Sequence, residues 1–115
     1  MTKYVVLWSN HKQAIIVSIT NGTEEILHVE SKAKGGVKEE WQHCLADYYQ
    51  EVIRAIQDAH EIFIFGPAEA KMQLKRAIMK VRTLAHRIAG TETADTMTQD
   101  ELVARAREMC GGGGG

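Results

Sequence analysis

The chain has 115 residues, of which 44% are hydrophobic and 25% are charged, and its formal net charge is −1. These values are typical of a single water-soluble domain that is long enough to bury a hydrophobic core. The near-neutral charge excludes a uniformly basic surface for nucleic acid, although local basic patches remain compatible with it.

Two further features bear on the compartment. No stretch approaches the ~18 consecutive apolar residues that a membrane span needs. The two cysteines, Cys44 and Cys110, show no CxxC spacing and are typical of buried or free thiols. We therefore expect a cytoplasmic protein that does not associate with membranes.

The first third of the chain predicts an antiparallel meander. Three short β-rich runs occur, at residues 4–8, 14–19 and 25–30. Asn21 and Gly22 lie between the second and third runs, and both residue types tolerate the positive φ of a tight hairpin turn. Short connections between successive strands favour antiparallel neighbours.

Residues 32–38, KAKGGVK, follow the meander and carry positive charge without any acidic residue. The adjacent pair Gly35 and Gly36 predicts a loop, which is either a plain linker or a binding segment. Lys32, Lys34 and Lys38 are the candidate contacts for an anionic partner.

Residues 39–59 predict an amphipathic helix, because apolar and aromatic residues recur at spacings of three and four. Since the aromatic residues share the phase of the aliphatic ones, core packing is favoured over an aromatic binding face. The face comprises Trp41, Leu45, Tyr48, Tyr49, Val52, Ile56 and Ala59.

Residues 61–87 organise the predicted fold. The almost wholly apolar run 61–65 predicts a strand that is buried on both faces, as in a parallel or mixed sheet. Gly66 and Pro67 then form a tight turn into a helix, because proline suits the first helical turn. That helix is expected to pack an apolar stripe through Leu74, Ala77, Ile78, Val81, Leu84, Ala85 and Ile88, and to expose the cations Lys71, Lys75, Arg76, Lys80, Arg82 and Arg87 to solvent.

The last part of the chain contains one well-marked helix. Residues 90–95 are polar and predict a weak edge strand or a loop. Thr98 and Glu101 have capping-box spacing at the start of a helix over 98–109, with Met97 and Leu102 as the hydrophobic staple. We expect residues 111–115, all glycine, to form a disordered tail and residues 1–110 to form one domain.

The element order is β-β-β-α-β-α-β-α, with about three helices. A three-stranded antiparallel meander followed by a helix and a strand that joins through a crossover is the layout of a ribonuclease-H-like motif. The predicted fold class is therefore α/β, with a mixed sheet covered by helices.

The sequence does not favour an enzyme. A two-metal nuclease needs clustered carboxylates, and the first strand and its end contain none. The five histidines are scattered without metal-ligand spacing, so no metal or other cofactor is expected. No serine or cysteine lies in a nucleophile motif.

Basic residues offer the alternative of nucleic-acid binding. Gly66 and Lys71 lie at a strand-to-helix junction, where free N–H groups attract anions, and Lys75 follows one turn later. Together with the lysines of 32–38, they would make salt-dependent contacts to RNA phosphates. Charged helix faces are also commonly just solvated.

Three blocks of sequence combine into a family resemblance. VVLWSNHKQAIIVSI, IFIFGPAEAKMQLKRAI and ETADTMTQDELVARARE resemble segments of small bacterial translational machinery proteins. Those proteins are similar to the middle domain of the eukaryotic and archaeal class-1 peptide-chain release factor. The resemblance covers nearly the whole chain apart from the glycine tail, and it implies the ribonuclease-H-like fold and a contact with the ribosome.

In the release-factor family, a Gly-Gly-Gln loop enters the peptidyl transferase centre, and Gly35-Gly36 occupy the corresponding position here. The next residue is Val37 rather than the glutamine that promotes peptidyl-tRNA hydrolysis, and Asn10 stands where an aspartate is usual. The resemblance thus implies a ribosome or RNA contact without hydrolytic activity.

Two hypotheses remain open from the sequence. The first is a non-enzymatic ribosome- or RNA-associated protein. The second is a homo-oligomeric or protein-interaction module with no role in nucleic-acid binding, which the near-neutral charge favours and which would use a strand edge or an apolar patch including Trp8 or Trp41.

Overall fold

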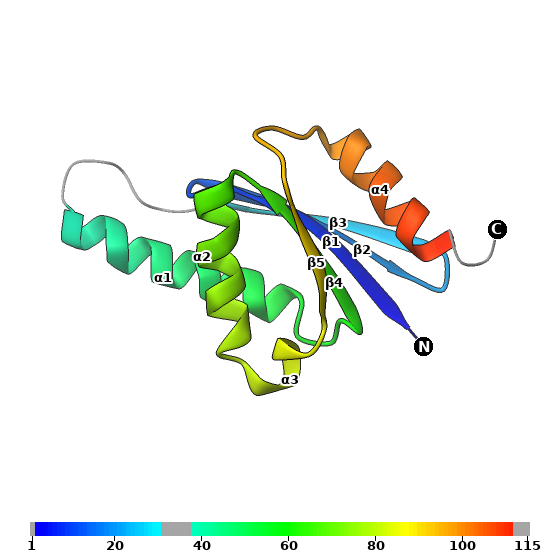
Figure 1. Cartoon of the computed structure of the whole chain (residues 1–115), viewed down its shortest axis with the longest axis horizontal. Helices are drawn as coiled ribbons and strands as arrows, with labels where there is room; N and C mark the ends of the chain where they lie inside the picture. Colours follow the sequence, from blue (N-terminus) through cyan, green and yellow to red (C-terminus); the bar gives the residue numbers. More distant parts are fainter. Residues whose placement is uncertain (1, 31–37, 112–115) are drawn as a thin grey trace.

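The computed structural model describes residues 2–30 and 38–111. One mixed sheet of five strands, ordered β3-β2-β1-β4-β5, has helices on both faces (Figure 1), which confirms the predicted fold class. The elements are β1 (Lys3–Ser9), β2 (Gln13–Thr20), β3 (Thr23–Glu30), α1 (Lys38–Ala55), β4 (Glu61–Gly66), α2 (Ala68–Met79), α3 (Arg82–Ala85), β5 (Ile88–Thr93) and α4 (Gln99–Gly111).

The predicted antiparallel meander is confirmed. β1 pairs with β2 and β2 pairs with β3, both antiparallel, and the β2–β3 ladder runs from Thr20–Thr23 to Gln13–Glu30 without a bulge. Asn21 and Gly22 have φ values of 53° and 78°, as a two-residue hairpin turn requires. The turn therefore fixes the register of β3.

β4 is the buried central strand that its apolar run predicts. It enters the sheet through the α1 crossover and pairs parallel to both β1 and β5. Ile62 and Ile64 face one side of the sheet, and Phe65 faces the other. Because both faces are covered, the strand shows a continuous apolar run instead of alternation.

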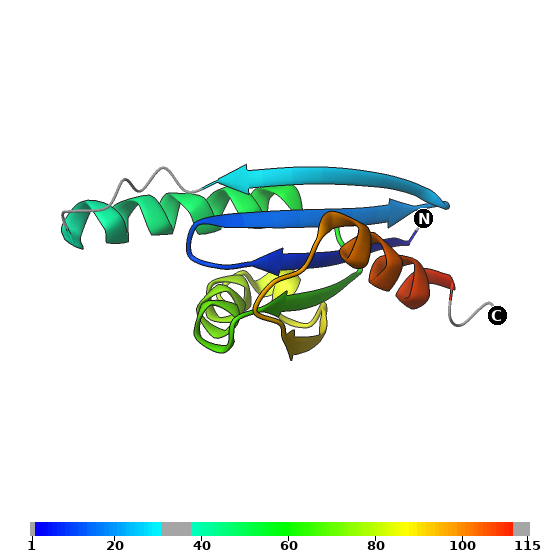
Figure 2. The same ribbon diagram turned by 90° about the horizontal axis from the view of Figure 1, so that it is seen from above.

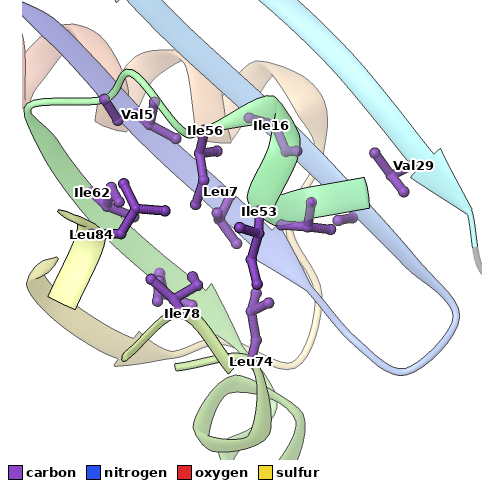
Figure 3. Close-up of a cluster of buried hydrophobic side chains, with 14 of the residues drawn as sticks. Val5, Leu7, Ile16, Val29, Ile53, Ile56, Ile62, Leu74, Ile78 and Leu84 are labelled. Carbon is purple, nitrogen blue, oxygen red and sulfur yellow. The ribbon is translucent and has the colours of Figure 1, made fainter. Parts of the chain in front are cut away.

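The helices divide between the two faces of the sheet. α1, α2 and α3 cover one face, and α4 alone packs on the other, as Figures 1 and 2 show. Figure 3 shows side chains of the first face meeting those of α1 and α2 in the larger core. That core includes Val5, Leu7, Ile16, Tyr48, Val52, Ile53, Ile56, Ile62, Ile64, Leu74, Ile78 and Leu84, and the smaller α4 core includes Val6, Trp8, Val17, Ile19, Phe65, Leu102 and Ala106.

The structure confirms the capping box predicted at the start of α4. Glu101 N donates to Thr98 Oγ1 at 3.1 Å, and Thr98 N donates to Glu101 Oε1 at 3.4 Å. These are the reciprocal bonds of a capping box. Met97 and Leu102 belong to the same core, as a hydrophobic staple requires.

The prediction of one long helix that carries the whole apolar stripe from Leu74 to Ile88 is wrong. α2 ends at Met79, Val81 is extended (φ −92°, ψ 108°), and Leu84 then enters the core from the four-residue helix α3. Ile88 starts β5, which ends at Thr93, so residues 90–93 of the polar stretch 90–95 form a strand and residues 94–95 do not. Of the stripe, Leu74, Ile78 and Leu84 are buried, and Ala77, Val81 and Ile88 are partly buried against the same core. The spacing therefore indicated core-facing side chains, but it did not require that one helix carry them all.

The interaction-module hypothesis places Trp8 in an exposed apolar patch, and the structure does not. Its side chain is buried, and its indole N–H donates to the carbonyl of Ala94 at 2.9 Å. Trp8 therefore cannot form an exposed contact patch. The side chain of Trp41 lies outside the described residues, and none of the helices in the described ranges is long and apolar enough to cross a membrane.

Candidate functional site

The carboxyl ends of four strands meet at one edge of the sheet. Ser9 lies opposite Ala14, and Glu30 lies opposite Gln13, so β1 and β3 end together. β4 and β5 run parallel to β1 and end at Gly66 and Thr93. Open α/β sheets bind ligands at such an edge, and polar side chains gather here. We therefore take this carboxyl edge as the candidate site.

A buried hydroxyl pair ties β1 to α1. Ser9 is fully buried, and its Oγ lies 2.9 Å from the hydroxyl of Tyr48. Both hydroxyls also reach the carbonyl oxygen of Asn10, at 3.1 Å from Ser9 and 3.2 Å from Tyr48. The three groups satisfy one another where the sheet meets the helix, as buried polar atoms require.

Asn10 shapes the turn between β1 and β2. Its Oδ1 accepts hydrogen bonds from the backbone N–H groups of Lys12 and Gln13, each at 2.8 Å. An aspartate carboxylate would accept the same two bonds. The asparagine found where the resembling family has aspartate thus serves the turn without adding a charge at this edge.

A second polar group joins the β1–β2 turn to both neighbouring helices. Gln73 Oε1 of α2 lies 3.0 Å from His11 Nε2 and accepts a bond from the hydroxyl of Tyr49 at 3.2 Å. Since the amide oxygen only accepts, Nε2 of His11 carries its proton in this arrangement. One side chain thereby connects the turn, α1 and α2.

Lys71 is not solvated, contrary to the expectation from sequence. Its side chain is 8% exposed, and its ammonium Nζ donates to Thr93 Oγ1 at 2.8 Å. No carboxylate among the described residues forms an ion pair with it. Lys71 therefore braces the start of α2 against the end of β5. Lys71 lies three residues before Leu74 and seven before Ile78, a spacing that places it on the buried face of α2. This spacing is the feature of the sequence that predicts its burial.

Gly66 permits a close approach between the ends of β1 and β4. A Cβ at this position would overlap the carbonyl oxygen of Ser9, and its φ of 157° is one that side chains rarely adopt. Its own carbonyl accepts the N–H of Ala94 at 2.9 Å. Glycine is needed here for backbone packing.

The structure brings together part of the predicted binding set. Gly66, Lys71 and Lys75 lie at the junction of β4 with α2 and along its first turns, and Lys75 is half-buried. Lys38 is the first residue of α1, but its side chain lies outside the described residues. Lys32, Lys34, Gly35 and Gly36 also lie outside them.

The site contains polar groups that the sequence interpretation did not single out, namely His11, Gln73 and Thr93, and it gives Asn10, noted there only as a departure from the resembling family, a role in the turn. Their common signal is position, because each lies at the end of a strand or on the helix turn that faces it. Within residues 2–30 and 38–111, no three histidine, cysteine, aspartate or glutamate side chains gather as metal ligands would. The hydroxyl pair of Ser9 and Tyr48 is buried and not open to a substrate. The polar groups at the carboxyl edge therefore hold the strand ends and the neighbouring helices in place.

A pocket of about 400 Å³ lies elsewhere, between α4 and β5. Arg105 lies over the ring of Phe65, 5.3 Å from its centroid, and pairs with Glu92 at 2.7 Å and with Glu108 at 3.8 Å. The arginine is thus already partnered by an aromatic face and two carboxylates. We assign no ligand to this pocket.

The tyrosines make the stability of the edge sensitive to alkali. Burial raises the pKa of Tyr48 far above its ordinary value, and burial raises that of Tyr49 to about 12. Unfolded tyrosines ionise near ~10, so above that pH the unfolded state loses protons that the folded state retains. We expect the free energy of unfolding to fall as pH rises from about 10 toward about 12.

Urea unfolding across this pH range would test the expectation, with Tyr49→Phe as the matched variant. The variant should lose stability with a shallower slope against pH than the wild type. Identical slopes would show that the Tyr49 phenol does not contribute to the alkaline transition.

The sequence matches no protein-family model and none of the curated proteins. The fold, however, is similar to solved structures of the Pelota protein of Thermoplasma acidophilum (TM-score 0.63, 18% identity, 90% of this chain) and of the archaeal translation termination factor aRF1 (TM-score 0.61, 12% identity, 92% of this chain). It is also similar to Dom34 of S. cerevisiae (TM-score 0.58, 9% identity, 88% of this chain), which is described as a translation termination-like factor involved in RNA quality control pathways and interacting with Hbs1.

The chain spans about a third of the length of these proteins, corresponding to 31% of Pelota, 33% of aRF1 and 31% of Dom34. At such low identity the likeness concerns the fold. It confirms the release-factor-like fold that the sequence resemblance implies.

Proposed function

We propose that this chain is a non-enzymatic, translation-related protein that contacts the ribosome or its RNA through the carboxyl edge of the sheet. The observation that carries the proposal is the fold, which is similar to a translation termination factor, aRF1, and to a translation termination-like factor, Dom34, over about nine-tenths of the chain. Because one fold can carry many functions, the proposal also requires contacts with the ribosome or its RNA, and we place these at the carboxyl edge.

The geometry at the edge supports this role. β3 ends at Glu30 on the same edge at which β4 turns into α2, and α1 begins at Lys38. Under the proposal, Lys32, Lys34 and Lys38 meet phosphates, Gly35 and Gly36 allow a close approach, and Lys75 extends the contact along α2. Lys71, which is held by Thr93, adds positive charge from behind this surface, and Gly66 shapes it.

Sedimentation with ribosomes is the direct test. Lysate from the native host is run on a sucrose gradient at low and at moderate salt, and the protein is followed by immunoblot. Phosphate contacts weaken as salt rises, so we expect the protein to travel with a ribosomal subunit or the whole ribosome at low salt and to be partly released at moderate salt. A protein that stays at the top of the gradient at both salts would contradict the proposal.

A charge-matched pair of variants localises the contact. We expect the triple variant Lys32→Ala, Lys34→Ala and Lys38→Ala to reduce the slope of log affinity against log salt by about 2 to 3, because each phosphate contact contributes ~0.7–0.9. The control removes three exposed cations near the opposite edge, through Arg54→Ala, Lys80→Ala and Arg87→Ala. An equal effect of both triple variants would indicate general charge attraction and would count against a contact at this edge.

The proposal also separates binding from hydrolysis. Since Val37 stands in place of the glutamine of the resembling family, purified protein added to ribosomes with peptidyl-tRNA should release no peptide above buffer. Release at a rate that depends on the protein would overturn the non-enzymatic part of the proposal while leaving the binding part intact.

A further inference from the structure

β3 is an edge strand of the sheet, and within residues 2–30 and 38–111 no strand pairs with its outer side. It borders the sheet in Figure 2, beyond β2, and its ladder to β2 has no bulge over eight residues. Its sequence, TEEILHVE, contains three glutamates but neither lysine nor proline, the two residue types that most often block such an edge. Ile26 and Leu27 are 38% and 49% exposed, and they are two of the four large hydrophobic side chains that are exposed in the described part of the chain.

The turn determines which backbone groups this edge offers. In a two-residue hairpin, the residues that flank the turn form a hydrogen-bonded pair, and bonded and non-bonded pairs then alternate. Thr20 and Thr23 flank the turn. Glu24, Ile26 and His28 therefore point their backbone N–H and C=O groups away from β2, toward a further strand.

We propose that this edge pairs with the β3 edge of a second copy of the chain, in an antiparallel arrangement with Ile26 opposite its own copy. A two-fold axis perpendicular to the sheet keeps the faces in register, so each side chain meets one of the same face. Glu24 then lies opposite the partner copy's His28 on the α4 face, where each side chain also keeps a contact with α4 of its own copy, Glu24 with Arg107 at 3.1 Å and His28 with Gln99 at 2.9 Å. Leu27 lies opposite Glu25 on the other face.

Charge selects this register among its neighbours. If the strands slide so that Leu27 meets its own copy, Glu24 lies opposite Glu30. If they slide the other way, the two Glu25 side chains face one another. Like charges directly opposite are destabilising across strands. With Ile26 on the axis, no two like charges are directly opposite, and the Ile26, Glu24 and His28 pairs fall on the outward-pointing backbone groups.

Sedimentation velocity of the purified chain up to about 1 mM tests the proposal, since strand pairing alone gives a small and weak interface. The register makes two matched substitutions act differently. Ile26→Lys places two ammonium groups opposite one another, and we expect it to raise the dimer Kd by at least about tenfold. Leu27→Lys places an ammonium opposite a glutamate, and we expect it to leave the Kd unchanged or lower.

Two controls carry equal exposure outside the edge. Met72 is 39% exposed and Met79 is 51% exposed, both on α2, and Met72→Lys and Met79→Lys should leave the Kd within about twofold of the wild-type value. Circular dichroism of each variant checks that the fold is retained. A wild-type chain that stays monomeric, or a dimer that Leu27→Lys breaks and Ile26→Lys does not, overturns the proposal.

Hydrogen exchange gives an independent readout. On concentration, the amides of Glu24, Ile26 and His28 should gain protection, while those of Glu25 and Leu27, which already bond to β2, should not change. A dimer whose protection appears elsewhere would also overturn the proposal. Because this test needs no ribosome, its failure is distinguishable from failure of the proposed function.

Discussion

Replacing Gly66 with alanine is expected to destabilise the protein by more than about 3 kcal/mol. The added Cβ would overlap the carbonyl oxygen of Ser9, which is backbone and cannot move aside as a side chain does. The φ of 157° adds the cost of a conformation that side chains rarely adopt. Relief requires that the ends of β1 and β4 separate at the point where the candidate site is built. Urea unfolding followed by tryptophan fluorescence measures the loss.

Two other glycines provide controls for this prediction. At Gly22, which has a φ of 78°, a Cβ would have no neighbour within 4 Å, so Gly22→Ala should cost only the conformational term of about 1 kcal/mol. At Gly90, a Cβ would lie 2.8 Å from Phe63 Cε2, which belongs to a partly buried side chain and not to the backbone. We expect Gly66→Ala to be clearly the worst of the three. A cost near that of Gly22→Ala would show that the two strand ends separate easily.

Truncating Tyr48 should give the second large effect. We expect Tyr48→Ala to cost about 3–5 kcal/mol, because it removes a buried ring from the core and leaves a cavity. Tyr48→Phe keeps the ring and removes only the hydroxyl that bonds to Ser9 and Asn10. Its cost should be about 1–2 kcal/mol, as for a buried hydrogen bond whose partners remain.

Tyr49→Phe is the matched control for the hydroxyl. Its phenol bonds to Gln73 in a half-buried position, so the loss should be smaller than for Tyr48→Phe. Urea unfolding of the three variants, compared at equal m-values, gives the free energies of unfolding that test these expectations. If Tyr48→Phe were as stable as the wild type, the hydroxyl network at the edge would contribute nothing net, and the ring alone would hold α1 to the sheet.

Most of the sheet could be predicted because its signals are local. The turn at Asn21-Gly22 fixes the hairpin, and the apolar run that ends at Phe65 has the pattern of a strand covered on both faces. Thr98 and Glu101 mark the start of α4 through a contact within one helical turn. In each case the residues that determine the element lie next to the residues that adopt it.

The remaining features depend on distant partners. The apolar stripe through Leu84 and Ile88 reports burial, and the same spacing fits one helix or a helix, a turn and a strand. The burial of Lys71 depends on Thr93, which approaches only after β5 has joined the sheet. The strand-to-helix junction and its cations predict Gly66, Lys71 and Lys75 as binding residues, and that role stays a prediction. The hydrogen-bonded groups of the edge give no such local signal, because they come from β1, α1, α2 and β5.

The position of α4 has a consequence for the order of folding. It is the last element of the described chain and the only helix of the described residues on its face of the sheet. Ala94 and Met97 also pack on this face, but Val6 and Val17 lack most of their cover until residues 99–111 dock. The meander and β4 present paired strands with a bare apolar face before that step, which is a template for aggregation. A chain interrupted before Gln99 should therefore aggregate through a surface that the finished molecule conceals, and a solubilising partner during synthesis would act on this face.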